Sequence, residues 1–345
     1  WRVRINITMA NFQINTITGK DSKRGTSFVG VTTVSSTGSM RIPSGPTEHR
    51  GGRGRAVFCG GESPTKLNTL DMIEIATIGD AIDFGDLSET KSNNSSTGSS
   101  TRGVVFGGEN PSASKKIDYF TFSSKGGASD FGDLLAVRRG ASSNASGNNT
   151  RGVTGGGNPG SADDNYETNY IEYVTIATTG NSTGFGDLIR HDTYMAAFAS
   201  PTRIVWGGGI SGPPTTYSQI IQYKEIASTG DTVDFGQLSA PRGSFGGAAS
   251  PTRGLFMGGK DPGSTDIIEY ITIATLGNAT DFGNLLSSKS NITACSNSIR
   301  AVAGGSNDEL NYVTISTTGN AVDFGNLTVG RGYLSACSDS HGGLG

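Results

Sequence analysis

Acidic side chains recur at three-residue spacing, and carboxylates in such groups could in principle bind calcium. The first group is Asp80, Asp83 and Asp86. A calcium loop, however, places its oxygens at alternate positions and adds a distant bidentate acid, which this spacing does not do. We therefore interpret the groups as Asx-stabilised hairpin turns and predict no metal site. The later groups are Asp130 and Asp133; Asn181 and Asp187; Asp231, Asp234 and Gln237; Asn278, Asp281 and Asn284; and Asn320, Asp323 and Asn326.

Two sets of basic residues recur as well, and two rings of cations could hold an anion. The alternative, which we prefer, is that they cap carbonyl groups between repeats or pair with Asp71, Asp118, Glu172 and Glu269. The first set precedes short apolar segments and comprises Arg55, Arg102, Arg151, Arg203, Arg253 and Arg300. The second set comprises Lys91, Arg138, Arg242, Lys289 and Arg331, with Arg190 two places early in one repeat.

Nucleophiles and metal ligands are few. His49, His191 and His341 occupy non-equivalent places, and neither a Gly-x-Ser-x-Gly elbow nor a phosphate-binding loop is present. The three cysteines show no Cys-x-x-Cys spacing, and Cys295 and Cys337 stand at the same place in successive repeats. We interpret these thiols as buried small apolar groups, with a disulfide bond as the alternative. The sequence thus predicts a protein without catalytic residues or cofactors, not an enzyme.

The elements that carry these residues form a sixfold repeat built on Phe-Gly-(Asp/Asn/Gln)-Leu. The intervals between copies are 47, 54, 50, 47 and 42 residues, and strand-like segments fill each unit. The unit that ends at Leu285 predicts strands at 242–249, 254–257, 267–274 and 280–285. A period near 50 residues with four strands per unit is typical of a β-propeller. The repeated phenylalanines are Phe84, Phe131, Phe185, Phe235, Phe282 and Phe324.

The order of elements within a unit resembles the kelch repeat: a basic residue, a small-residue strand, an apolar strand ending in Gly-Gly, a strand with Tyr, and a final aromatic strand. Phe stands where kelch repeats usually have Trp. The segment from Ile268 to Leu285 also resembles kelch-like virion proteins of tailed phages of marine bacteria. This resemblance implies a structural or binding component of a phage particle, on the tail or capsid surface, assembled in several copies.

The predicted architecture is an all-β, six-bladed propeller over 43–345, preceded by an extended arm at 1–42. The segment 331–338 forms one more opening strand, whereas Pro43 and Pro46 disfavour such a strand at the start. We therefore expect the C-terminal strand to complete the first blade and close the ring. A composite seventh blade is the alternative. The arm is expected to dock on another virion protein or to pack on its own propeller.

Composition limits the partners. The net charge of −3 disfavours nucleic acid, and no apolar run is long enough to span a membrane. The loops 158–170 and 210–217 are the longest insertions between second and third strands, and loops are where binding residues usually lie. We predict contacts to sugar or protein from four aromatic residues in or near these loops, and the alternative is that their side chains only hold the loops in place: Tyr166, Tyr170, Trp206 and Tyr217. The prediction is a non-enzymatic, homo-oligomeric virion protein, with a glycan-binding host-receptor protein and a kelch-type oxidase or lyase as alternatives.

Overall fold

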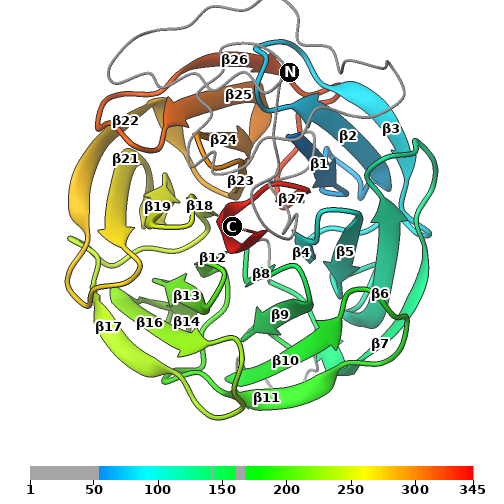
Figure 1. The fold of residues 1–345 in the computed structure, drawn as a ribbon, viewed down its shortest axis with the longest axis horizontal. Helices are drawn as coiled ribbons and strands as arrows, with labels where there is room; N and C mark the ends of the chain where they lie inside the picture. The colour runs from blue at the N-terminus through cyan, green and yellow to red at the C-terminus, as the bar shows by residue number, and fades with distance from the viewer. Residues whose placement is uncertain (1–53, 141–142, 161–167, 345) are drawn as a thin grey trace, which may run out of the picture. The chain divides into compact units, whose positions relative to one another are not determined.

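The structure is a computed structural model that describes residues 54–140, 143–160 and 168–344. These residues form six antiparallel sheets around a central axis (Figure 1). The all-β, six-bladed prediction is therefore confirmed, and the seven-blade alternative is wrong. The predicted arm at 1–42 and the adjoining residues 43–53 lie outside the described residues.

Each blade contains four main strands, ordered from the axis outward. Blade 1 contains β27 (Ser335–Ser338), β1 (Arg55–Cys59), β2 (Thr69–Glu74) and β3 (Ile82–Asp86). Blade 2 contains β4 (Ser95–Gly98), β5 (Arg102–Phe106), β6 (Ser114–Thr121) and β7 (Ser129–Arg138). Blade 3 contains β8 (Ala145–Gly147), β9 (Arg151–Gly155), β10 (Tyr170–Thr175) and β11 (Thr183–Asp187).

The remaining blades follow the same order. Blade 4 contains β12 (Ala196–Ala199), β13 (Arg203–Gly207), β16 (Ile220–Glu225) and β17 (Val233–Gln237), and carries the hairpin β14 (Ile210–Ser211) and β15 (Thr216–Tyr217). Blade 5 contains β18 (Gly246–Ala249), β19 (Arg253–Met257), β21 (Gly263–Thr272) and β22 (Thr280–Lys289), with the short β20 (Lys260–Asp261) beside β21. Blade 6 contains β23 (Ile292–Ser296), β24 (Arg300–Gly305), β25 (Asn307–Thr314) and β26 (Val322–Asn326).

Ring closure occurs in blade 1, where the C-terminal strand β27 pairs antiparallel with β1 in the register Val57↔Cys337. The carboxylate of Asp339 then accepts hydrogen bonds from the amides of Gly54 and Arg55, at 3.1 and 2.9 Å. This pairing confirms the predicted closure. It also removes the free edge that β1 would otherwise expose.

The hydrophobic core is divided into six clusters, and each lies between two neighbouring blades. One cluster, for example, joins Val104, Phe106 and Phe131 of blade 2 to Val174 and Ile176 of blade 3. The repeated phenylalanines are all buried, and in blades 2 to 6 each packs against the third-strand tyrosine of its own blade. No single blade can bury its faces alone, which is the physical reason for the repeat.

A backbone contact, which we call the inter-blade clasp, joins each blade to the next. The amide of a glycine in the hairpin before the fourth strand donates to the carbonyl of the preceding blade's repeated phenylalanine, at 2.7–2.9 Å. The glycine that follows the phenylalanine lies so close that a Cβ there would come within 2.5 Å of that hairpin in all six blades. The glycine pairs are Gly85 and Gly126, Gly132 and Gly180, Gly186 and Gly230, Gly236 and Gly277, Gly283 and Gly319, and Gly325 and Gly79.

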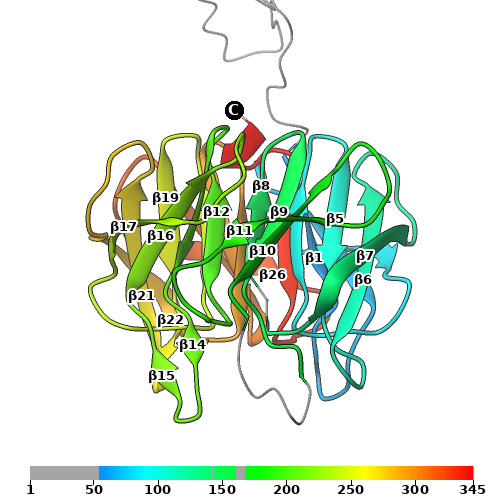
Figure 2. The same ribbon diagram turned by 90° about the horizontal axis from the view of Figure 1, so that it is seen from below.

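The two ends of the axis differ. The hairpin β14–β15 projects from the end at which the inner strands begin, which we call the lower face (Figure 2). At the opposite, upper face, the 3-10 helix η1 (Gly342–Leu344) lies buried over the axis, and His341 Nε2 lies 2.6 Å from the carbonyl oxygen of Gly98.

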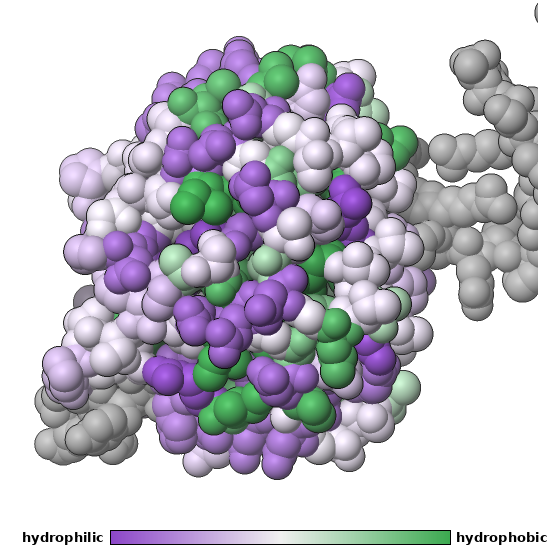
Figure 3. All heavy atoms as spheres, turned by 90° about the vertical axis from the view of Figure 1, so that its left-hand side faces the viewer, coloured by the Kyte–Doolittle hydropathy of each residue, from purple (hydrophilic) through white to green (hydrophobic). Residues whose placement is uncertain are grey.

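Several large apolar side chains are exposed on the outer surface. Figure 3 shows one side of the ring, where apolar residues are interspersed with polar ones. Val233 and Val322 of outer strands and Leu276 of a hairpin are examples of exposed residues. Exposed apolar residues of this kind are common on protein surfaces. Within the described residues, no helix has the length and apolar character needed to cross a membrane.

Alanine at Gly283 should destabilise the propeller more than alanine at Gly319. Both glycines have positive φ, at 146° and 155°, so both changes carry a backbone cost of about 1–2 kcal/mol. Only at Gly283 would the new Cβ also meet a backbone oxygen, at 2.4 Å, whereas the space around Gly319 is open. Urea unfolding should show an additional loss of about 1–3 kcal/mol for Gly283→Ala. Equal losses for the two variants would contradict the clasp.

Candidate functional site

The acidic groups serve the inter-blade clasp. In five blades the first residue of the group accepts, through Oδ1, a hydrogen bond from the amide of the variable residue in the preceding blade's Phe-Gly-x-Leu, at 2.9–3.1 Å. Blade 2 has Gly127 at this position. Within the described residues, no cluster of three or more His, Cys, Asp or Glu side chains could hold a metal ion. The five accepting residues are Asp80, Asn181, Asp231, Asn278 and Asn320.

The first arginine set also joins neighbouring blades. Arg102, for example, places its guanidinium 4.9 Å from the ring centre of Tyr119 and donates through Nη1 to the carbonyl of Ala177 in the next blade, at 2.9 Å. The other arginines of the set also donate to a carbonyl just after the third strand of the next blade, at the position equivalent to Ala177 or one residue before it. In blade 1, which lacks the tyrosine, Arg55 pairs with Glu74 at 3.0 Å instead. The predicted capping of carbonyls between repeats is confirmed.

Four members of the second basic set form buried ion pairs with the middle of a third strand. The nitrogen–oxygen distances are 2.6–2.7 Å, and the carboxylates are at most 2% exposed. The same carboxyl groups accept bonds from the segment that enters the blade, for example Glu172 from the amide of Leu135 at 2.8 Å. Burial lowers the pKa of Arg138, and the carboxylate of Glu172 opposes that shift. The predicted pairs are confirmed as Asp71–Arg331, Asp118–Lys91, Glu172–Arg138 and Glu269–Arg242.

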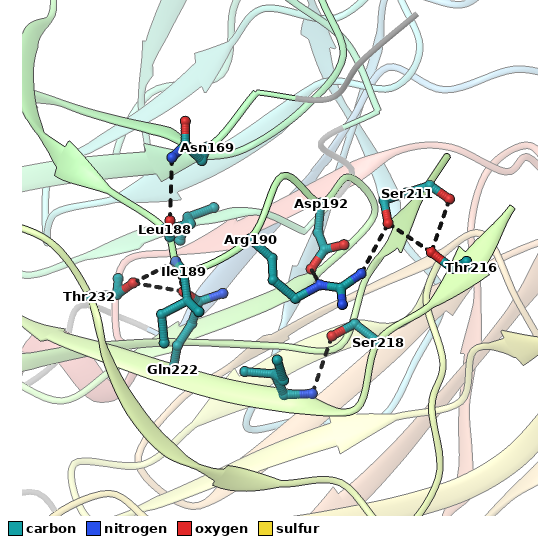
Figure 4. Close-up of polar contacts among 11 residues, drawn as sticks. Asn169, Leu188, Ile189, Arg190, Asp192, Ser211, Thr216, Ser218, Gln222 and Thr232 are labelled. Carbon is teal, nitrogen blue, oxygen red and sulfur yellow. Dashed lines mark hydrogen bonds and ion pairs between the residues drawn. The ribbon is translucent and has the colours of Figure 1, made fainter. Parts of the chain in front are cut away.

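Blade 4 breaks this pattern (Figure 4). Gln222 replaces the acid, and its Oε1 accepts hydrogen bonds from the amide of Ile189 and the hydroxyl of Thr232, at 2.8 and 2.7 Å. The side chain of Arg190 lies outside the core. It contacts Asp192 Oδ2 at 3.2 Å and donates to the hydroxyl of Ser211 in β14 at 3.1 Å, so it supports the β14–β15 hairpin. In blade 4, where an amide replaces the buried carboxylate, the arginine therefore contacts a loop instead of a buried acid.

The four predicted contact residues do not form one site. Trp206 is fully buried and donates through Nε1 to the carbonyl of Asn144 at 3.0 Å, so its prediction as a contact residue is wrong. Trp206 lies on β13, the second strand of blade 4, and belongs to the hydrophobic cluster between blades 3 and 4. Tyr170 is 56% exposed at the start of β10 in blade 3, whereas Tyr217 pairs with Ile210 in the β14–β15 hairpin of blade 4. Tyr166 and His49 lie outside the described residues.

All three cysteines are free and buried, which confirms their interpretation as apolar packing groups. Burial raises the pKa of the Cys59 and Cys295 thiols, whereas a nucleophilic cysteine needs a lowered one. The axis between the inner strands retains a cavity of about 30 Å³, lined mainly by small residues such as Ala145, Ala248 and Ser338. Such a volume suits isolated water rather than a substrate.

A ring of six residues around the axis at the lower face was not recognised from the sequence. Each residue stands nine places after a repeated phenylalanine and has positive φ, between 54° and 72°. At five of the six junctions between blades, the amide of one member donates to the carbonyl of the member in the preceding blade, at 2.7–3.1 Å. We call these residues the axial ring: Asn93, Gly140, Tyr194, Ser244, Asn291 and Tyr333.

Tyrosine is an unexpected residue in the axial ring. The left-handed conformation costs about 1–2 kcal/mol for an L-residue, and only Gly, Asn and Asp adopt it readily. Tyr194 and Tyr333 belong to blades 4 and 1, which face each other across the ring, yet their ring centres are only 6.4 Å apart. Both side chains must therefore reach over the axis. Strained residues of this type are concentrated at functional sites.

Charged residues of the lower loops surround these rings, and we call the whole group the axial mouth: the axial ring with Glu62, Lys66, Glu109 and Arg139. Glu109 is held by Lys66 at 3.0 Å, by Arg139 at 2.7 Å and by the side-chain amide of Asn93 at 3.3 Å. Although burial opposes ionisation, the hydrogen bonds from Arg139 and Lys66 lower the pKa of Glu109. Burial raises the pKa of Tyr194 to about 12, and Tyr333 and Glu109 add to that shift.

No protein-family profile matches the chain, and neither does any curated protein. The geometry of the axial mouth and the resemblance of the repeats are therefore the grounds for a functional proposal.

Replacement of Glu172 by Gln should destabilise the protein by about 3–5 kcal/mol, because the buried guanidinium of Arg138 would lose its counter-charge. Urea unfolding measures this loss. The double variant Arg138→Met/Glu172→Gln is the matched control and should recover most of the stability, since no uncompensated charge remains. A loss below about 1 kcal/mol in the single variant would be the contrary result.

Stability should fall as pH rises from about 10 to about 12 through Tyr194, because the unfolded chain loses this proton near pH 10 while the folded protein keeps it to about pH 12. Tyr194→Phe should remove this contribution. The measurement is the free energy of unfolding at about pH 9 and about pH 11 for both proteins. Tyr170→Phe, at an exposed position, is the control. An unchanged pH dependence in Tyr194→Phe would contradict the burial of this phenol.

Proposed function

We propose that the protein is a non-enzymatic virion component, a rigid propeller on the tail or capsid surface of a phage that mediates subunit assembly and presents a binding face. The observation that carries the binding role is that the repeated polar residues are engaged within and between blades. The four buried ion pairs, the arginine contacts and the hairpin Asx contacts all stabilise the ring. We therefore expect the residues that bind a partner to be among the features that differ between blades.

Those differing features are concentrated at the lower face. Within the described residues, the β14–β15 hairpin and the arginine that supports it belong to blade 4, and the two tyrosines of the axial ring belong to blades 4 and 1. Loops held on a rigid scaffold are the usual place for binding residues. Because each loop is anchored by strands of a closed ring, a ligand would not have to order the scaffold on binding.

The assignment to a virion draws on the resemblance of the repeats to kelch-like virion proteins. In this proposal residues 1–42 dock on a neighbouring virion protein and the propellers are arranged as a homo-oligomer in a symmetric particle. Repetition of one propeller around a particle would multiply weak contacts into strong attachment.

Deletion of residues 1–42 should leave the thermal unfolding of the propeller nearly unchanged but abolish incorporation into particles. The measurement is quantitative mass spectrometry of purified particles of a phage that carries the gene, complemented with the full chain or the deletion variant. Alanine substitution of Val3, Ile5 and Ile7 in the full chain is a second, milder test and should reduce incorporation in the same direction. Normal incorporation of both variants, or no copies of the full chain in particles, would refute the proposal.

A further inference from the structure

Two of the six blade junctions carry a pair of exposed apolar side chains on the outer surface. The inter-blade clasp brings together the residue two places before a repeated phenylalanine and, from the next blade, the residue before the hairpin glycine. At the junction of blades 6 and 1 these residues are Val322 and Ile78, which are 53% and 56% exposed. At the junction of blades 4 and 5 they are Val233 and Leu276, which are 55% and 58% exposed. At the other four junctions at least one of the two residues is Ser, Thr or Lys.

The junction of blades 6 and 1 has two further features. Ile299, which is 62% exposed, precedes Arg300, whose guanidinium donates to a carbonyl of blade 1 at 2.9 Å. Residues 1–53 join the propeller at the same junction, because Gly54 precedes β1 of blade 1 and a Cβ on it would lie 3.8 Å from Nδ2 of Asn297 in blade 6. We call the three exposed apolar side chains of this junction the apolar rim: Ile78, Ile299 and Val322.

The charge of the chain is divided between residues 1–53 and the propeller. Residues 1–53 contain eight Lys and Arg against two Asp and Glu, a net charge of +6, whereas residues 54–345 contain 19 against 28, a net charge of −9. Beside the apolar rim, Asp83 and Asp323 of the outer strands are exposed, and neither forms an ion pair with a described residue. A basic, partly apolar segment of chain is therefore the complement of this surface.

One stretch of residues 1–53 has the matching pattern. The segment Arg2–Ile7 alternates arginine or asparagine with apolar residues. In an extended chain this alternation presents Val3, Ile5 and Ile7 on one side, and arginine side chains are long enough to reach acids beside an apolar surface. The 46 residues between Ile7 and Gly54 can span up to about 150 Å, which is far enough to reach a neighbouring copy.

We propose that the apolar rim of one copy binds the segment Arg2–Ile7 of a second copy of this chain. The apolar side of the segment packs on the rim, and its two arginines face Asp83 and Asp323. Because the segment belongs to a chain that joins its propeller at the same junction, two copies related by a twofold axis exchange segments reciprocally. Reciprocal exchange places two such contacts in one complex, which favours a second copy over the same chain. The inference rests on the proposed function only for its setting, a homo-oligomer within a particle.

Sedimentation velocity of the full-length protein over a range of concentrations tests the proposal. The full chain is expected to dimerise, and higher salt should weaken the dimer because opposite charges take part in the contact. The decisive variant is Ile78→Thr/Val322→Thr, since threonine occupies both positions at the junction of blades 5 and 6. Its dimer dissociation constant should rise about tenfold or more, because two apolar contacts are lost, while the thermal midpoint stays unchanged.

Val233→Thr/Leu276→Thr is the matched control, since it makes the equivalent change at the junction of blades 4 and 5, and it should leave the dissociation constant unchanged. Val3→Ala/Ile5→Ala/Ile7→Ala should weaken the dimer as the rim variant does. The combination of both variants should weaken it no further, because the two remove the same contact. A monomeric full chain, equal effects of the two threonine variants, or additive losses in the combined variant would each overturn the proposal.

Particle incorporation separates failure of this inference from failure of the virion role. Particles made with Ile78→Thr/Val322→Thr should contain fewer copies of the protein than particles made with the unsubstituted chain. Normal incorporation of this variant into particles that contain the unsubstituted chain contradicts the docking surface and leaves the virion role intact. A dimer that behaves as expected, together with particles that lack the chain, contradicts the virion role and supports the docking surface.

Discussion

The hydrogen bond from a hairpin glycine to the carbonyl of a repeated phenylalanine is the contact on which the rest of the structure depends. It occurs at all six blade junctions, including the junction from Phe324 back to Gly79. Each junction also contains one of the six apolar clusters, so a blade buries its faces only when both neighbours are docked. Stability is therefore a property of the closed ring, and damage at one junction exposes the apolar surface of two blades.

The buried ion pairs show how the repeat tolerates change without leaving a charge uncompensated. Where Gln222 replaces the acid in blade 4, the basic residue moves to Arg190 and turns to Asp192 and the β14–β15 hairpin. Where Asn311 replaces it in blade 6, Lys289 pairs with Glu309 at 2.9 Å. At both sites the basic residue thus keeps an acidic partner although the particular pair changes, as the high cost of an unpaired ion requires. The blades that depart from the repeat are then free to acquire different loops.

The fold could be predicted from the sequence because each blade repeats its own local signals. The glycine after a phenylalanine such as Phe84 or Phe131 marks the fourth strand in all six blades, and a tyrosine such as Tyr119 marks the third strand in five of them. Whether a given side chain is buried in the core or lies at the surface was less predictable from the sequence. A tryptophan after an apolar run, as at Trp206, can lie in a core or beside a loop, and only the packing of two blades decides. The axial ring was missed because its members share a backbone conformation and a spacing from phenylalanine, not a residue type. Alignment of the repeats on phenylalanine would have revealed two tyrosines where Asn, Gly or Ser otherwise stands.

The pairing of β27 with β1 has a consequence for how the protein is made. The two strands are separated by almost the whole propeller, as the 285-residue distance in sequence between Gly54 and Asp339 shows. During synthesis β1 leaves the ribosome long before β27 has been made. The edge of β1 that pairs with β27 therefore stays unpaired while the other blades fold. Long-range closure of this kind is slow, and nascent propellers with an open edge are prone to pair with one another. Crowded synthesis of many copies in one cell would therefore favour chaperone protection of blade 1 until the last strand emerges.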